Sequence, residues 1–378
     1  MTDWQDKAHR FAAELTTLGV LEPGWRAAFA SVPRHLFVPS FYRDDNTIMD
    51  GASPELRAEW LAAIYRDESL TTQQIQVPGT DMMWPTSSST QPSLMARMLS
   101  LLDMSDNHTV MEIGTGTGYN AALLSHRLGD GNVASIDIDP TLVEQARTRL
   151  DQAGYRPFLA AGDGAGGIPA RAPFDRIIAT CAVPAIPASW VAQLRDQGVI
   201  VADVRGEMSS ALVTATKIGP DTVQGRFLAV PGHFMWLRAN PRNPLRDGGR
   251  LNTVIDIDGA RRSTTTVAPS VLSNHEFRFM LNLSVPSISF AGHIDREHGR
   301  VHLLRTSDGS WAEIDATSQD GRHPTAQGGS RSVWDEVEAA AKQWADLGRP
   351  DRSRFGLTAT STGAHHIWLD DPDNIVNQ

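Results

Sequence analysis

Short apolar runs alternate with amphipathic runs through the middle of the chain, and this alternation predicts strands followed by helices. Val110–Ile113 is short and almost wholly apolar, which is typical of a buried strand. A helical pattern begins at Tyr119, and residues 133–136 form a second apolar run that leads into Asp137. The order strand, helix, strand predicts a βαβ unit with parallel strands.

The same alternation continues toward the C-terminus. Apolar runs predict strands at residues 158–161, 174–180 and 198–202, and residues 188–194 predict a helix before the last of them. Residues 211–218 and 223–230 flank a Gly-Pro-Asp turn, so we expect a hairpin at the edge of the sheet.

The segments before the βαβ unit predict helices and one long loop. Residues 3–18 predict a helix whose apolar face carries Trp4, Phe11, Leu15 and Leu18. A second helix follows Pro23, and residues 93–102 predict a third. Residues 71–92 hold several prolines and many hydroxyl side chains, which favours a long loop over regular structure.

Beyond residue 238 the pattern changes. Residues 238–249 are rich in Asn, Pro, Arg and Gly, which indicates a boundary. A Ser-Asp-Gly turn predicts that residues 302–306 pair with 310–314, and a helical run ends near Leu347. Residues 355–360 and 365–369 predict a further hairpin.

The turn after the first strand carries a ligand-binding pattern. Gly114, Gly116 and Gly118 follow Glu112 as E-x-G-x-G-x-G, and glycine permits positive φ and close approach of a ligand. Asp137 lies 19 positions after Gly118 (137 − 118), where a nucleotide-type βαβ unit has its ribose-binding carboxylate. Dinucleotide sites use G-x-G-x-x-G to hold a pyrophosphate. The present spacing favours a cofactor with a polar amino-acid tail, such as S-adenosylmethionine.

Composition limits the functional classes. With 378 residues, 41% hydrophobic and 21% charged, the chain fits a soluble globular protein of more than one domain. A formal charge of −10 argues against nucleic-acid and anionic-membrane partners. The single cysteine, Cys181, excludes an internal disulfide and suits the cytosol. The N-terminus lacks the apolar core of a signal peptide, so we expect a cytoplasmic protein.

A set of ordered motifs resembles the protein-L-isoaspartate O-methyltransferase family. They are VPRHLFVPSFY at residues 32–42, MEIGTGTGYNAALL at 111–124, IDIDP at 136–140, AGDGAGGIP at 161–169 and FDRIIATCAVPAIP at 174–187. The resemblance covers roughly residues 18–230. It implies an α/β fold, a Rossmann-like class I methyltransferase with a mostly parallel doubly wound sheet.

Three parts follow from this resemblance. Residues 1–92 would hold N-terminal helices and a substrate loop, and residues 93–237 the core that binds S-adenosylmethionine. Residues 238–378 would form a C-terminal α+β accessory domain that recognises a peptide substrate. We expect that deleting this third part leaves cofactor binding intact and impairs peptide capture.

The resemblance also implies roles for individual residues. The cofactor S-adenosylmethionine, and S-adenosylhomocysteine as product, would contact Glu112, Gly114, Thr115, Gly116, Gly118, Asp137, Ile138, Asp163 and Gly164. Asp137 would bind the ribose, and Asp163 with Gly164 the adenine. Thr90, helped by Ser88 and Ser89, would hold the substrate carboxylate. A carboxylate is ionised at neutral pH, so the transfer requires no general base and no metal.

Two departures from the family pattern bear on the substrate. The family's hydroxyl loop is T-I-S-x-P, whereas residues 88–92 place Thr90 at the position of the serine. The extension at 238–378 is expected to be absent from repair enzymes, and its end resembles methyltransferases of graspetide, lanthipeptide and lasso-peptide maturation. The sequence therefore predicts methylation of an aspartate side chain in a ligase-modified ribosomal precursor peptide, whose ester collapses to aspartimide or isoaspartate.

Other functions stay open. The first is repair of isoaspartyl residues in damaged proteins, which would use the same cofactor site. The second is a peptide-binding module with an inactive site, although the intact glycine motif, Asp137 and Asp163 argue against it. The third is methylation of a small carboxylic acid. Cys181 ends an apolar run and is expected to be buried packing or cavity wall.

Overall fold

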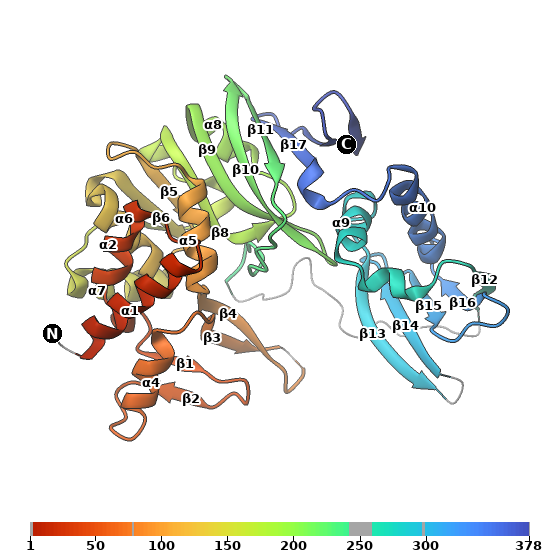
Figure 1. The fold of residues 1–378 in the computed structure, drawn as a ribbon, viewed down its shortest axis with the longest axis horizontal. Helices are drawn as coiled ribbons and strands as arrows, with labels where there is room; N and C mark the ends of the chain where they lie inside the picture. The colour runs from red at the N-terminus through yellow and green to blue at the C-terminus, as the bar shows by residue number, and fades with distance from the viewer. Residues whose placement is uncertain (1–2, 78, 242–258, 297–298, 378) are drawn as a thin grey trace.

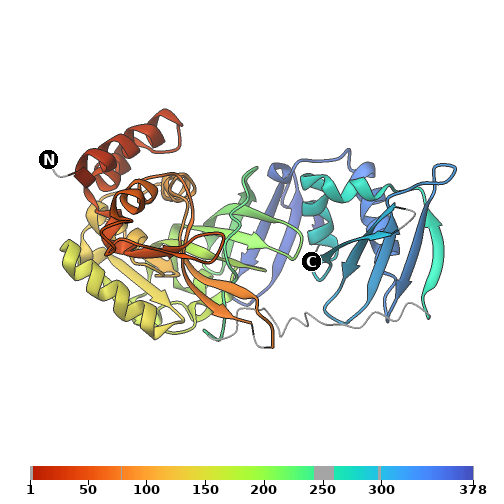
Figure 2. The same cartoon turned by 90° about the horizontal axis from the view of Figure 1, so that it is seen from below.

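A computed structural model describes residues 3–77, 79–241, 259–296 and 299–377. The predicted boundary at 238–249 lies outside these ranges from residue 242 onward. The molecule is elongated: the N-terminal helices and the parallel strands lie at one end and a separate five-stranded sheet at the other (Figure 1, Figure 2). Within the described ranges, none of the helices has the length and apolar character needed to cross a membrane.

The main sheet has ten strands. Five are parallel, in the order β9-β8-β5-β6-β7, and confirm the predicted βαβ alternation: β5 (Val110–Ile113), β6 (Val133–Asp137), β7 (Phe158–Ala161), β8 (Phe174–Val183) and β9 (Leu194–Arg205). Beyond β9 the strands are antiparallel: β10 (Ser210–Gly219), β11 (Thr222–Phe227), β17 (Phe355–Thr360), β18 (His365–Leu369) and β19 (Ile375–Asn377).

Alternate side chains of the parallel strands enter two separate cores. Val110 and Ile178 pack with the N-terminal helices, whereas Met111 and Ile177 face a second core that extends into the C-terminal part. This follows from the two-residue period of a strand whose faces are both covered by helices. The helices of the first core are α1 (Asp3–Thr17), α2 (Pro23–Ser31), α5 (Pro92–Leu101), α6 (Tyr119–Leu128) and α7 (Pro140–Ala153).

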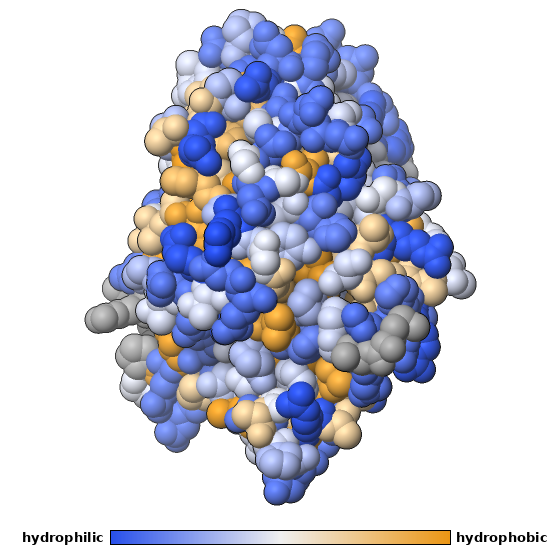
Figure 3. Space-filling view, turned by 90° about the vertical axis from the view of Figure 1, so that its left-hand side faces the viewer, coloured by the Kyte–Doolittle hydropathy of each residue, from blue (hydrophilic) through white to orange (hydrophobic). Residues whose placement is uncertain are grey.

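The predicted helices α1, α2 and α5 are confirmed, with local corrections. Leu18 was expected on the apolar face of α1 but is 61% exposed, because the helix ends at Thr17 and Gly19 turns the chain with φ +70°. Short helices also occur at α3 (Arg34–Phe37) and at α4 (Arg57–Ile64). The surface at this end is mostly hydrophilic, as expected for helices that turn their apolar faces inward (Figure 3).

The predicted long loop at 71–92 is wrong. The chain there forms a hairpin of β3 (Leu70–Gln76) and β4 (Met83–Ser89), within a four-stranded sheet that also holds β1 (Ser40–Tyr42) and β2 (Ile48–Asp50). Pro85 is tolerated because β4 is an edge strand, where a missing N–H disturbs no ladder. The register shifts near Gln73 absorb the remaining irregularity.

The last predicted hairpin does form, but it joins the main sheet. β17 pairs with β11, so the hairpin of β10 and β11 is not at the sheet edge as expected. Phe355, Leu357 and Ala359 of β17 are buried in the second core. Deleting 238–378 would thus remove three strands of the main sheet, and the expected independence of the first 237 residues is not supported.

The C-terminal part carries its own antiparallel sheet of five strands. Their order is β12 (Arg261–Thr265), β16 (His323–Gly328), β15 (Trp311–Asp315), β14 (Gly299–Arg305) and β13 (Ser289–Arg296). The pairing of β14 with β15 confirms the predicted hairpin there. Helices α9 (His275–Ser284) and α10 (Val333–Asp346) pack in the second core and join the two sheets.

Replacing Leu357 tests whether β17 is part of the main core. Leu357 is fully buried, so Leu357→Ala should lower the free energy of unfolding by about 3 kcal/mol in urea titration. Thr362→Ala, at the exposed tip of the same hairpin, should change it by less than about 0.5 kcal/mol. Equal, small effects of both changes would show that the hairpin is detached from the core.

Candidate active site

A cavity of about 600 Å³ lies at the carboxyl ends of β5, β6 and β8. Parallel sheets bind ligands at this edge, where strand order reverses between β5 and its neighbours. The wall opposite the strand ends is made by β4 and by residues 230–238. The volume is in the range of sites for small molecules and cofactors.

The glycine turn closes the strand side of the cavity. Gly114 has φ +100°, and a Cβ there would lie 2.7 Å from Thr180 Oγ1 on β8. Gly116 has φ +50° and lines the cavity. Gly118 does not line it: a Cβ there would lie 3.1 Å from Ala146 Cβ, so this glycine allows α6 and α7 to pack closely. The predicted turn is therefore present, with a packing role for its third glycine.

Glu112 lies at the centre of a buried hydrogen-bond network. The side chain is fully buried and lines the cavity. Asn120 Nδ2 and Ser135 Oγ donate to its two oxygens over 2.7 and 2.6 Å, and Thr115 Oγ1 lies 2.6 Å from Ser135 Oγ. Burial raises the pKa of Glu112 to about 7, against the opposing effect of these hydrogen bonds. Its charge is therefore sensitive to pH and to any cation in the cavity.

Asp137 is held where the sequence predicts a ribose-binding carboxylate. The Gly116 N–H donates to Asp137 Oδ2 (2.8 Å) and the Asp139 N–H to Oδ1 (3.1 Å). Ile138 and Gly164 line the same region of the cavity. Asp163 is not among the lining residues; its carboxylate is exposed and accepts from the Ala165 N–H (2.9 Å). The adenine contact expected of Asp163 stays a prediction.

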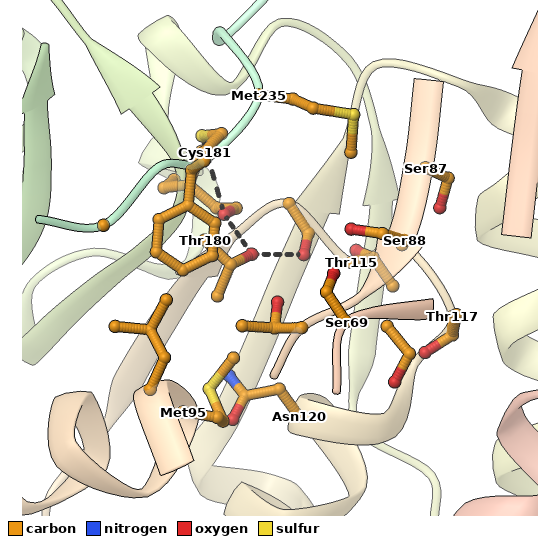
Figure 4. Close-up of a pocket in the computed structure, with 18 of the residues that line it drawn as sticks. Ser69, Ser87, Ser88, Met95, Thr115, Thr117, Asn120, Thr180, Cys181 and Met235 are labelled. Carbon is orange, nitrogen blue, oxygen red and sulfur yellow. Dashed lines mark hydrogen bonds between the residues drawn. The ribbon is translucent and has the colours of Figure 1, made fainter. Parts of the chain in front are cut away.

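The hydroxyl side chains of β4 face the glycine turn. Ser88, Ser89 and Thr90 all line the cavity, as does Ser87, which the sequence analysis missed although it belongs to the same hydroxyl run. Figure 4 shows Ser87 and Ser88 across the cavity from Thr180. Ser88 and Thr90 are half-buried, whereas Ser89 is buried and accepts a hydrogen bond from Arg34. Ser88 and Thr90 are thus better placed than Ser89 to meet a ligand.

Arg34 holds the end of β4 in place and was also missed. Its guanidinium is fully buried and donates to Ser89 Oγ and the Thr90 carbonyl oxygen, each at 3.3 Å. It also donates to the carbonyl oxygens of Ile64 (2.6 Å), Arg66 (3.1 Å) and Glu68 (3.2 Å). These partners are backbone groups, so no side-chain motif reveals them in the sequence.

Residues 230–238 complete the cavity. The Ala182 N–H at the end of β8 donates to the Met235 carbonyl oxygen, and the Leu237 N–H donates to that of Ala182, both at 2.8 Å. Arg238 lines the cavity and donates through Nη2 to the Thr86 carbonyl oxygen of β4 (2.9 Å). Cys181 is a buried wall residue, and burial raises the pKa of its thiol.

The chain is similar to proteins of one known family. The family model "Protein-L-isoaspartate(D-aspartate) O-methyltransferase (PCMT)" matches residues 9–231. A protein-L-isoaspartate O-methyltransferase of Xanthobacter autotrophicus is 47% identical over 112 residues, which span 29% of this chain and 50% of the relative. That of Syntrophus aciditrophicus is 32% identical over 232 residues, 59% of this chain and 92% of the relative. The chain thus spans about half the length of the first relative and nearly all of the second.

A solved structure titled "Protein-L-isoaspartate O-methyltransferase" has the same overall fold. It is 22% identical, with a TM-score of 0.56, and the match covers 96% of this chain and 99% of that chain. The match includes the C-terminal extension. The expectation that proteins of this name lack such an extension is therefore wrong.

We expect Glu112 to make cofactor binding dependent on pH. A cationic ligand in the cavity favours the ionised carboxylate, so binding should release a proton and the affinity for S-adenosylmethionine should rise as pH increases from 6 to 8. Titration calorimetry should show Glu112→Gln binding more weakly and without this dependence. Glu14→Gln, an exposed change on α1, should keep it. An affinity of the unmodified protein that does not vary with pH would contradict this role of Glu112.

Proposed function

The chain belongs to the protein-L-isoaspartate(D-aspartate) O-methyltransferase family, and on this premise we propose that it methylates a peptide carboxylate with S-adenosylmethionine. One observation carries the proposal. A single cavity of about 600 Å³ holds the glycine turn and Asp137 on one side and the hydroxyl side chains of β4 on the other. A cofactor and an acceptor can therefore meet in it.

The residues of the cavity fit this cofactor. Gly116 leaves space for a ligand beside the backbone, and Asp137 offers carboxylate oxygens to ribose hydroxyls. Glu112 offers a negative charge near the turn, suited to an ammonium or sulfonium group. When bound, S-adenosylmethionine supplies an electrophilic methyl group.

The chain's own contribution is to bind, align and exclude water. The acceptor carboxylate is ionised at neutral pH, so no residue has to remove a proton from it. Ser88 and Thr90 would donate hydrogen bonds to the carboxylate and direct one oxygen toward the methyl group. Residues 230–238 cover the cavity and limit the access of water. Alignment of this kind lowers the barrier of a bimolecular displacement, because the entropy cost of bringing the reactants together is met on binding.

Isoaspartyl residues of peptides or damaged proteins are the acceptor that the comparisons support best. The relatives are named for that activity, and the match to a solved structure of the same name includes the C-terminal extension. Maturation of a ligase-modified ribosomal peptide remains a second candidate, supported only by the sequence features at Thr90 and in residues 238–378. Thr90 lines the cavity, so its extra methyl group lies where it can alter the choice of acceptor.

A matched pair of peptides and a third, ligase-modified peptide separate these candidates. We expect mass spectrometry to show a gain of one methyl group on a peptide containing isoaspartate, and none on the same sequence with an ordinary aspartate. Methylation followed by loss of methanol on a ligase-modified peptide alone would contradict repair and support maturation. Transfer to none of the three peptides would contradict the proposed function.

A further inference from the structure

The acceptor in the proposed reaction is an anion, yet two of the side chains nearest the glycine turn are the carboxylates Glu112 and Asp137. A second anion in a partly closed cavity needs a positive partner to offset its desolvation. Of the described residues that line the cavity, those able to carry a positive charge are Arg97, His233 and Arg238. Arg97 and His233 are exposed, whereas Arg238 is half-buried.

We propose that the guanidinium of Arg238 binds the acceptor carboxylate of the substrate; this inference rests on the proposed methyl transfer to a carboxylate. The backbone fixes the place of Arg238. The two hydrogen bonds between Ala182 and residues 235 and 237 pair the segment with the end of β8, and Arg238 is the next residue. Its side chain therefore starts at the carboxyl edge of the sheet, beside the cavity.

The guanidinium reaches from this edge of the sheet to β4. Nη2 donates to the carbonyl oxygen of Thr86, two residues before Ser88, and Nη1 donates to that of Pro241 (3.3 Å). These bonds use two of the five N–H donors of an arginine, and both anchor it to backbone. The planar guanidinium, anchored in this way, is suited to bidentate pairing with a carboxylate. The same carboxylate would accept a hydrogen bond from the Ser88 hydroxyl.

Arg238 lies near other ionisable groups that line or adjoin the cavity. Burial lowers the pKa of Arg238, and Asp137 and Asp139 at the ribose end oppose this shift. Burial and nearby carboxylates raise the pKa of Cys181 at the end of β8, and Arg238 opposes that shift. Arg238 therefore interacts electrostatically with Asp137 and Asp139 and with Cys181.

Arg238 also links the extension to the site. The family model ends at residue 231, seven positions before Arg238 (238 − 231), whereas β4 lies within the matched region. The anchor is therefore supplied by the segment that leads into the C-terminal part, outside the region that the family model describes. This segment contributes to acceptor binding in addition to covering the cavity.

The anchor is compatible with the chemistry. A carboxylate has about four lone-pair sites, so an oxygen paired with Arg238 keeps a lone pair for the methyl carbon. The new O–C bond forms as the C–S bond breaks, and the electron pair of that bond goes to sulfur. The product ester is neutral, so its attraction to Arg238 is weaker and its release is favoured.

The test compares two peptides in the unmodified protein, in two variants of Arg238 and in one control variant. One peptide contains isoaspartate; the other has a carboxamide in place of the acceptor carboxylate and is measured as a competitive inhibitor. The unmodified protein should bind the carboxylate peptide about tenfold or more tightly than the carboxamide, as expected for a charge-assisted hydrogen bond. Arg238→Gln should reduce this ratio to about one and raise KM, and Arg238→Lys should restore part of it.

Cofactor binding and a charge control separate this role from others. The Kd of S-adenosylhomocysteine should change less than about threefold in Arg238→Gln, because the anchor acts on the acceptor. Arg26→Gln, the same charge change at an exposed position on α2, should leave the peptide ratio unchanged. A carboxylate preference that survives in Arg238→Gln, or an equal loss of cofactor affinity, would overturn the proposal. Absence of methylation by the unmodified protein would overturn the proposed function instead.

Discussion

The pairing of β5 with β6 on one side and β8 on the other is the constraint on which the site depends. Parallel strands end at one edge, so this pairing brings Glu112, Asp137 and Cys181 together from positions far apart in the chain. The close approach of Gly114 to Thr180 then requires a residue without a Cβ. β4 and residues 230–238 can complete the cavity only because the carboxyl edge of the parallel strands is already formed.

The pattern of apolar residues and the spacing of motifs predicted those parts of the fold that are determined by residues close together in the sequence. The βαβ unit, its glycine turn and Asp137 follow from apolar periodicity and spacing within about thirty residues. The β3–β4 hairpin was missed because Pro85 was taken as a breaker, although an edge strand tolerates it. The pairing of β17 with β11 joins segments more than a hundred residues apart, and nothing in either segment specifies that partner.

The missed site residues share one physical feature. Arg34 holds the end of β4 through Ser89 Oγ and the Thr90 carbonyl oxygen, and Arg238 holds β4 through the Thr86 carbonyl oxygen, so both depend on backbone oxygens of residues distant in sequence. Motifs record side chains, so such contacts become visible only in the folded chain. Ser88, Ser89 and Thr90 all line the cavity, but Ser89 is buried and bound by Arg34, whereas Ser88 and Thr90 are half-buried, a difference that the hydroxyl motif does not contain.

A crystal structure of the protein with S-adenosylhomocysteine and an isoaspartyl peptide is the most direct test of the proposed methyl transfer. We expect the ribose on Asp137, the adenine beside Gly164, and the acceptor carboxylate between Ser88 and Arg238 with one oxygen directed at sulfur. A cofactor bound away from the glycine turn, or a carboxylate on the far side of β4 from the cavity, would contradict it.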